Sequence, residues 1–350
     1  MIDLRSDTVT LPTDAMRQAM RDADLGDDSR DGDPTVRRLE EMAARVTGKE
    51  AGLLVASGTM ANLIALLTHA RHGGEVLLDA QGHIMRSELG GVARLAGLFP
   101  KAYPSNAGIP DAACLRELIY PKTTKARIAT SLISIETSHN DAGGMVPPLA
   151  CLSDVQDAAL NAGVPIHIDG ARLFNAAVFL DVPASEIARC GDSVGFCLSK
   201  GLSAPVGSVL CGSGAFIERA RAYRRMVGGA MRQAGIIAAA GIVALETMVE
   251  RLADDHLHAG QIARGLCAVA PGLADPKRVQ TNIVMVDVST TGMPADVWIE
   301  KLALRGIRAG AWSRTSLRLV THRHIDAAAV GQAIDVFQLI YRTEVPRWAS

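Results

Sequence analysis

The stretch DSVGFCLSKGLSAPVGSVLCG (192–212) places one lysine between two apolar segments. Residues 193–199 predict a strand buried on both faces, and residues 207–212 predict a second strand. Lys200 follows the first strand and is surrounded by glycine, serine and alanine. A lysine at a strand end is commonly a surface residue whose stem packs on the protein. Here the small neighbours leave space and little water, which favours a nucleophilic amine that forms an imine with an aldehyde.

Apolar strands alternate with helices on both sides of this stretch. Such alternation predicts a largely parallel α/β sheet with helices on both faces. Thr13 is expected to cap a first helix, and Asp33, followed by Pro34, a second. The further expected strands are 52–57, 75–78, 131–136 and 164–169, and the further helices are 59–70, 90–97, 148–162, 214–227 and 231–251.

The pattern changes after about residue 255, which predicts a second domain. Residues 1–250 are expected to form a large domain that includes an N-terminal arm (1–13), and residues 251–350 a small α+β domain. In the small domain we expect helices over 257–269, 295–304 and 325–341, and strands over 282–287 and 316–320.

The composition is that of an ordinary globular protein. Of the 350 residues, 48% are hydrophobic and 21% charged, and the net charge is −1, so nothing favours binding to nucleic acid or to an anionic membrane. The N-terminus has no apolar signal region, and the longest apolar run (236–245) is about half of a membrane span. The six cysteines show no paired spacing. We therefore expect a cytoplasmic protein with reduced thiols and no metal site.

Three polar sites are expected at one edge of the sheet, where strands end and helices begin. Asp169 ends the strand in HIDGARLFNA (167–176), and Lys200 follows the next strand. Each site has an ordinary alternative: an Asp169–Arg172 ion pair, a surface lysine, or a simple strand–turn–helix junction. In SGTMAN (57–62), backbone N–H groups at a helix start would favour an anion; they belong to Ser57, Gly58 and Thr59.

Together the three sites match the chemistry of pyridoxal 5'-phosphate (PLP). The helix start would take the phosphate, Asp169 would keep the pyridine nitrogen protonated, and Lys200 would bind the aldehyde as a Schiff base. His83, in QGHIMRSELGG (81–91), follows a strand at the same edge, and its flat ring can stack on the cofactor. The alternative for His83 is an ordinary loop histidine.

Six segments resemble the L-threonine aldolase family, PLP-dependent enzymes of fold type I in the aspartate aminotransferase superfamily. The resemblance covers essentially the whole chain and implies a mostly parallel seven-stranded sheet sandwiched by helices, with a smaller C-terminal α+β domain. It also implies a homo-oligomer, a dimer or a dimer of dimers (homotetramer), with shared active sites. The segments are DLRSDTVTLPT (3–13), LVASGTMANLIAL (54–66), HIDGARLFNAAV (167–178), CLSKGLSAPVGSVL (197–210), GGAMRQAG (228–235) and LRLVTH (317–322).

The resemblance implies a role for each matching residue. Lys200 carries PLP, Asp169 bonds the pyridine nitrogen, and His83 stacks on the ring and handles protons. The cofactor-binding set is Ser57, Gly58, Thr59, His83, Asp169, Arg172, Ser199, Lys200 and, from the neighbouring subunit, Arg232. The substrate carboxylate is bound by Ser6, Arg172 and Arg318, and guanidinium groups suit a carboxylate on chemical grounds as well.

The family's reaction is retro-aldol cleavage of a β-hydroxy-α-amino acid, such as L-threonine or L-allo-threonine, to glycine and an aldehyde. Two departures affect the side-chain pocket. Arg30 stands where the family has a tyrosine, and no histidine occupies the region of Ala126 and Arg127. One hypothesis is that Arg30 enters the pocket and favours a polar or acidic β-substituent; the alternative is that it faces solvent or pairs with Asp28 or Asp31.

Two other functions remain open from the sequence. The same scaffold could perform other PLP chemistry, such as β-elimination, dehydration, transaldol transfer or cyclisation. A PLP-binding protein without turnover is the second alternative, against which the carboxylate-binding residues argue.

Overall fold

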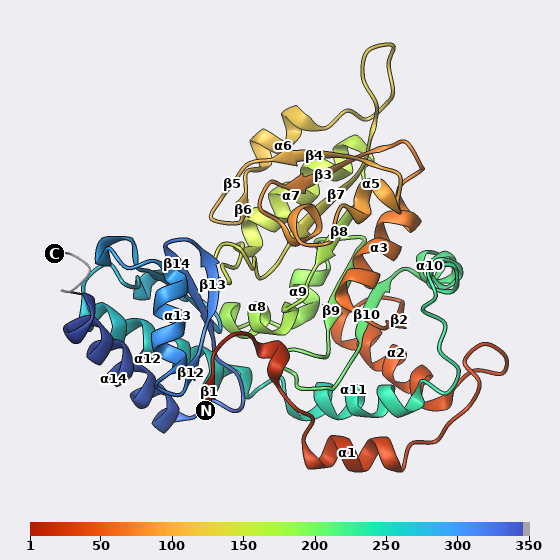
Figure 1. Ribbon diagram of the computed structural model, residues 1–350. Coiled ribbons are helices and arrows are strands. Elements are labelled where there is room, and N and C mark those ends of the chain that lie inside the picture. Colours follow the sequence, from red (N-terminus) through yellow and green to blue (C-terminus); the bar gives the residue numbers. More distant parts are fainter. Residues whose placement is uncertain (346–350) are drawn as a thin grey trace. The chain divides into compact units, whose positions relative to one another are not determined.

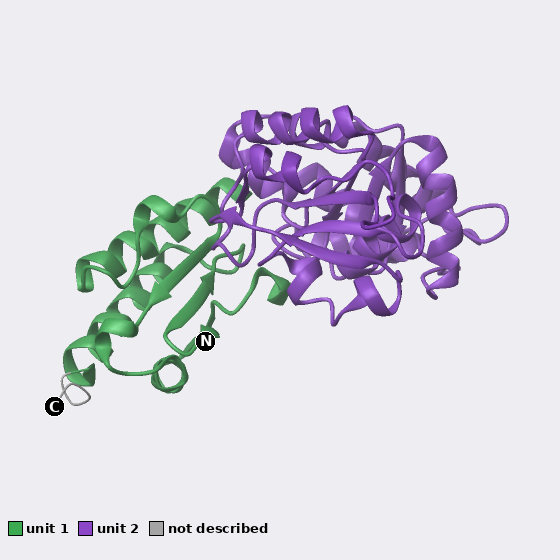
Figure 2. Ribbon diagram, turned by 90° about the horizontal axis from the view of Figure 1, so that it is seen from above, with its two compact units in different colours: residues 1–11, 250–350 green, residues 12–249 purple. Residues whose placement is uncertain are grey.

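A seven-stranded sheet forms the centre of the larger of two units (Figure 1). The structure is a computed structural model and describes residues 1–345. The larger unit spans residues 12–249, and the smaller one combines residues 1–11 with residues 250–345 (Figure 2).

All strands of the large sheet run in the same direction except β10, which is antiparallel to both of its neighbours. The mostly parallel sheet expected from the sequence is therefore confirmed. Val55 and Cys197 both pair with Ser208, so β2 and β9 end at the same level. In spatial order the strands are β2 (Ala51–Val55), β10 (Ser208–Gly212), β9 (Ser193–Cys197), β8 (Ile166–Asp169), β7 (Thr130–Glu136), β3 (Glu75–Asp79) and β4 (Phe99–Tyr103).

Helices cover both faces of this sheet. On one face, Leu53, Val55 and Leu210 pack against α3 (Gly58–His69) and α10 (Gly214–Met226), with α5 (Gly91–Arg94) beside them. The other face carries α2 (Pro34–Thr47), α6 (Ala112–Leu118), α7 (Leu149–Ala162) and α9 (Ala184–Ala188). The remaining elements are α1 (Asp14–Arg21), α4 (His83–Arg86), α8 (Leu173–Leu180), α11 (Gly235–Thr247) and the β5–β6 pair (Ser105–Asn106, Ile109–Pro110).

The expected helix caps are confirmed. Thr13 Oγ1 accepts from the N–H of Met16 at the start of α1, and Asp33 accepts from the N–H of Val36 at the start of α2. Pro34 occupies the first position of α2, where its missing N–H costs nothing.

The smaller unit is α+β, as expected. Its antiparallel sheet has the order β11 (Ile283–Asp287), β14 (Ser316–Val320) and β13 (Gly310–Ser313), and its core includes Trp298 and Phe337. The other elements are η1 (Asp7–Val9), α12 (Leu252–Val269), η2 (Pro276–Arg278), η3 (Ser289–Thr291), α13 (Ala295–Ala303) and α14 (Ala327–Thr343).

The N-terminal arm differs from the expectation. Residues 1–11 belong to the smaller unit, not to the large domain in which the sequence analysis placed them. The cause is that β1 (Ile2–Asp3) pairs in parallel with β12 (Ile307–Arg308), and that Leu4 is fully buried in the core of the smaller unit. Within residues 1–345, no helix combines the length and the apolar character that crossing a membrane requires.

Candidate active site

The carboxyl edge of the large sheet brings the three expected polar sites together. Asp169 ends β8, and Lys200 follows β9, which pairs with β8 in parallel. Ser57 follows β2, whose end is level with that of β9 because both pair with Ser208. Topology alone therefore places the start of α3, Asp169 and Lys200 at one edge, where open α/β sheets bind ligands.

The start of α3 leaves backbone donors available. Ser57 Oγ accepts from the N–H of Met60, which caps the helix. The N–H groups of Gly58 and Thr59 lie in the first turn, where a helix offers no acceptor of its own. A Cβ atom at Gly58 would lie 2.9 Å from Cys197 Sγ, so α3 begins directly against the end of β9.

Asp169 is buried, with 3% of its surface exposed. Its Oδ2 accepts from Asn62 Nδ2 at 2.9 Å, and its Oδ1 accepts from the N–H of Ala171 at 3.2 Å. Both of these donors are neutral groups, an amide side chain and a backbone N–H.

His83 is the first residue of α4, and hydrogen bonds fix both its backbone and its ring. Its N–H donates to Glu136 Oε2 at 2.6 Å, and its Nδ1 lies 3.0 Å from Glu88 Oε1. The hydrogen bond to Glu88 raises the pKa of His83 above its ordinary value, and the charges of Asp169 and Glu136 act in the same direction. With Nδ1 bound to Glu88, Nε2 is the ring atom that remains for proton transfer.

His83, Glu88 and Asp169 place ligand atoms within 4.8 Å of one another, a spacing compatible with a metal ion. However, Glu88 and Asp169 both accept from the same Asn62 amide, at 2.8 and 2.9 Å. The group is thus already connected by hydrogen bonds, and we interpret it as a hydrogen-bonded network.

Arg172 and Lys200 line one small cavity, together with Asn175 and Cys197. Arg172 is buried, and its Nη1 donates to Asn140 Oδ1 at 3.3 Å. Ser199 precedes the half-buried Lys200 at the end of β9.

Ser6 and Arg318 belong to the smaller unit. Ser6 Oγ accepts from the N–H of Thr8 at 3.2 Å. Arg318 stacks over the ring of Trp312 at 4.6 Å and donates to the carbonyl of Arg5, the residue before Ser6. The structure therefore brings these two expected carboxylate-binding residues close to each other.

Arg232 and Arg30 both lie near the carboxylate of Asp27. Arg232 is 60% exposed, and its Nη1 lies 3.6 Å from Asp27 Oδ1. Arg30 is 79% exposed, and its Nε lies 3.7 Å from Asp27 Oδ2. The solvent-facing alternative for Arg30 is thus the one that the structure favours, with Asp27 as its partner in place of Asp28 or Asp31.

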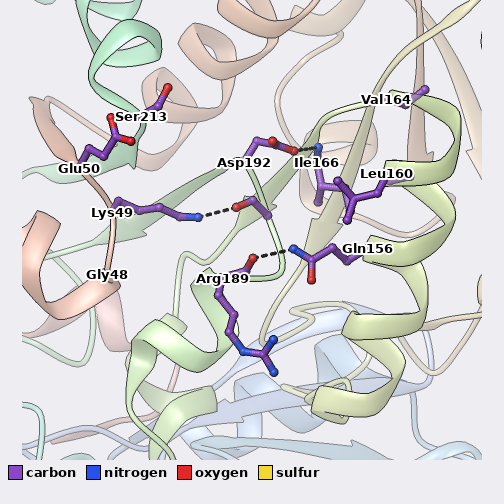
Figure 3. A pocket seen from close by; sticks show the side chains of 12 residues that line it. Gly48, Lys49, Glu50, Gln156, Leu160, Val164, Ile166, Arg189, Asp192 and Ser213 are labelled. Atoms are coloured by element: carbon purple, nitrogen blue, oxygen red, sulfur yellow. Dashed lines mark hydrogen bonds between the residues drawn. The ribbon is translucent and has the colours of Figure 1, made fainter.

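A separate pocket of ≈ 350 Å³ lies at the amino edge of the sheet (Figure 3). Lys49 Nζ donates to the carbonyl of Gly191 at 2.5 Å, and Asp192 accepts from the N–H of Ile166 at 2.7 Å. The pocket contains none of the predicted site residues, and Lys49 and Asp192 bind backbone groups next to strand starts there. Asp169, Lys200 and the start of α3 lie at the opposite edge of the sheet.

Sequence reasoning missed the residues that support this site: Asn62, Glu88, Glu136 and His167. Two carried a usable signal, because Asn62 interrupts an apolar helix and His167 an apolar strand, and a buried polar residue needs a partner. Glu88 and Glu136 carried none, since acidic residues in loops and at strand ends are usually solvated.

The fold defines the class of protein. The structure of a threonine aldolase from Leishmania major matches with a TM-score of 0.81 at 16% identity, over 97% of this chain and 100% of that one. An aspartate aminotransferase double mutant from Thermus thermophilus matches with a TM-score of 0.71 at 14% identity, over 97% and 91%. This is the α/β fold of the fold type I enzymes, as the sequence predicts.

The sequence then gives the family. Residues 3–291 match the beta-eliminating lyase family, and the chain belongs to that family. Low-specificity L-threonine aldolase 1 of Arabidopsis thaliana is 40% identical over 341 residues, 96% of this chain and 95% of that protein. The low specificity L-threonine aldolase of Escherichia coli K12 is 40% identical over 324 residues, 92% and 94% respectively. The resemblance seen in the sequence motifs is confirmed.

Proposed function

We propose that this protein is a PLP-dependent lyase that cleaves a β-hydroxy-α-amino acid, L-threonine or L-allo-threonine, into glycine and an aldehyde. The observation that carries the proposal is the shared sheet edge of Asp169, Lys200 and the start of α3. The choice of reaction is supported by the names of relatives that are about 40% identical over nearly the whole chain.

The residues at this edge fit PLP. Ser208 Oγ is buried and has no hydrogen-bond partner among residues 1–345, and it would lie 3.9 Å from a Cβ atom at Gly58. A buried hydroxyl without a partner, close to a helix N-terminus whose N–H groups are available, suits the binding of a phosphate. We therefore assign the phosphate to Gly58 and Thr59, with Ser57 and Ser199 beside them. The buried carboxylate of Asp169 suits a protonated ring nitrogen.

The chemistry that PLP supplies when bound is an electron sink for the pair released from the Cα–Cβ bond. Lys200 would hold the cofactor aldehyde through its amine. His83 would cover the ring, and its Nε2 would take the proton of the substrate β-hydroxyl, because Nδ1 is bound to Glu88. A pKa raised by Glu88 strengthens this imidazole as a base.

Arg172 is a reasonable carboxylate ligand because it is buried and lines the same small cavity as Lys200. A guanidinium group can bind a carboxylate through two parallel hydrogen bonds. We also assign Ser6 and Arg318 to the carboxylate, as the resemblance to the family implies. Binding the α-carboxylate would fix which bond at Cα breaks, so positioning would select the reaction.

The active form would be a homo-oligomer, a dimer or a dimer of dimers, in which Arg232 reaches the phosphate of the neighbouring subunit. The exposure of Arg232 and its long 3.6 Å ion pair with Asp27 support this assignment, since a weak surface pair is easily exchanged.

The test is a visible spectrum followed by product analysis. We expect the purified protein to bind PLP with a visible band that borohydride bleaches, and Lys200→Ala to lack this band and to lose its aldehyde-releasing activity. Incubation with L-threonine or L-allo-threonine should release glycine and acetaldehyde in equal amounts. Ammonia and a keto acid in place of these products would reject the aldolase assignment.

A further inference from the structure

Asn62 is a buried polar residue that the proposed chemistry does not use. It lies on α3, is 2% exposed, and is surrounded on its helix by apolar residues. Its Nδ2 donates to Asp169 Oδ2 at 2.9 Å and to Glu88 Oε1 at 2.8 Å. An amide nitrogen has two hydrogens, and both are used here. The same group therefore holds the two carboxylates together.

His167 fixes the orientation of the Asn62 amide through the amide oxygen. Because Nδ2 gives both hydrogens to acceptors, Oδ1 must accept, and it lies 3.1 Å from His167 Nε2. His167 therefore carries its proton on Nε2. Its Nδ1 then accepts from Ser193 Oγ at 2.9 Å, and Ser193 Oγ in turn accepts from His69 Nε2 at 2.7 Å.

The hydrogen bonds of this series therefore all run in one direction. They lead from His69 at the end of α3 and Ser193 on β9, through His167 and Asn62, to the two carboxylates. The direction requires neutral imidazoles. Burial lowers the pKa of His167 to about 4 and that of His69 to about 3, so both rings are neutral near pH 7. The hydrogen atoms of this series can thus be assigned consistently, and each of its side chains has a hydrogen-bond partner.

We propose that Asn62 is a positioning residue that holds Asp169 and Glu88 in a fixed arrangement, with His167 fixing its amide. The inference rests on the proposed function, in which Asp169 bonds the cofactor ring nitrogen and Glu88 orients His83 over the ring. Through one amide, Asn62 would couple the contact of Asp169 with the ring nitrogen to the contact of His83 with the face of the ring. Without this donor, two buried carboxylates would face each other and separate.

The first experiment measures PLP binding to apoprotein by titration and by the visible circular dichroism of the bound cofactor. Asn62→Ala should raise the Kd for PLP about tenfold, as expected for the loss of hydrogen bonds to charged groups, and should weaken the visible dichroism. Thr68→Val is the matched control on the same helix, because within residues 1–345 the Thr68 hydroxyl donates to the carbonyl of Ile64, one turn earlier, and contacts neither carboxylate. Wild-type affinity and dichroism in Asn62→Ala would overturn the proposal.

A double-mutant cycle separates positioning from general stability. If Asn62 acts through Asp169 and Glu88, then adding Asn62→Ala to Asp169→Asn should raise the Kd by clearly less than the roughly tenfold effect of Asn62→Ala alone, because only the branch through Glu88 remains. Multiplication of the two single effects would overturn the proposal.

Should Asn62→Ala fail to fold by far-ultraviolet dichroism, His167 offers the same test. His167→Gln keeps a nitrogen donor near the position of Nε2 and should retain PLP affinity, whereas His167→Leu should weaken it as Asn62→Ala would. Equal affinities for the two variants would count against the inference. A wild type that binds PLP but releases no aldehyde would reject the proposed reaction alone, because these measurements report on the bound cofactor.

Discussion

At the scale of single residues, Glu88 decides how His83 behaves as a base. The hydrogen bond from Nδ1 to Glu88 is the main reason that the pKa of His83 is raised, and Asp169 and Glu136 add to it through their charge. Glu88→Gln keeps an acceptor oxygen but removes the charge. The pKa of His83 should fall, and the acidic limb of the kcat/KM profile for L-threonine should move to lower pH, since the imidazole stays neutral further into acid.

The control for this pH profile is Glu117→Gln, an exposed glutamate on α6. It should leave the profile in place. An unchanged or raised acidic limb in Glu88→Gln would mean that His83 is not the group that titrates.

At the scale of elements, Asp33 ties three segments to one carboxylate. It is fully buried and accepts from the N–H groups of Val36, Gly26 and Gly235 at 3.0 to 3.1 Å. Asp33→Ala leaves all three donors without a partner, and we expect a loss of about 3 kcal/mol or more in the free energy of unfolding. Asp111→Ala, at the exposed start of α6, should cost about 1 kcal/mol. Urea unfolding followed by circular dichroism compares the two, and similar losses would contradict the argument.

Such contacts between distant segments also explain which features could not be predicted from the sequence. Strands and helices that follow a clear period were predicted, and their order placed Asp169 and Lys200 at one edge. Helix α11 begins at Gly235 and not at residue 231, because the carboxylate of Asp33 takes the N–H of Gly235. Strand β4 was missed because it contains Pro100 and Lys101, which suit its position at the sheet edge. Asn62 could be noticed as a polar residue in an apolar helix, but its partners come from elements distant in sequence.

At the scale of the whole molecule, the N-terminal segment shows which contacts cannot be predicted from the order of residues. DLRSDTVTLPT has no periodicity that would identify the segment it packs against. The pairing of β1 with β12 and the burial of Leu4 assign residues 1–11 to the smaller unit. Ser6 then reaches the vicinity of Arg318 through a contact that spans more than three hundred residues, Arg318 to the carbonyl of Arg5. Such long-range pairings depend on complementary geometry, which the order of residues does not display.

The proposed sharing of sites between subunits can be tested by mixing two defective variants. If Arg232 serves the neighbouring subunit, a mixed dimer of Lys200→Ala and Arg232→Ala contains one intact site, with Lys200 from one chain and Arg232 from the other. Random pairing of equal amounts should then restore about a quarter of the wild-type activity, because half of the dimers are mixed and each has one intact site of two. The measurement is aldehyde release at limiting PLP after the variants are unfolded together and refolded. Lys200→Ala mixed with Asp169→Ala should stay inactive, since both residues serve the same subunit's site. No recovery in the first mixture would place Arg232 in its own subunit's site, and wild-type activity of Arg232→Ala alone would place it outside the site.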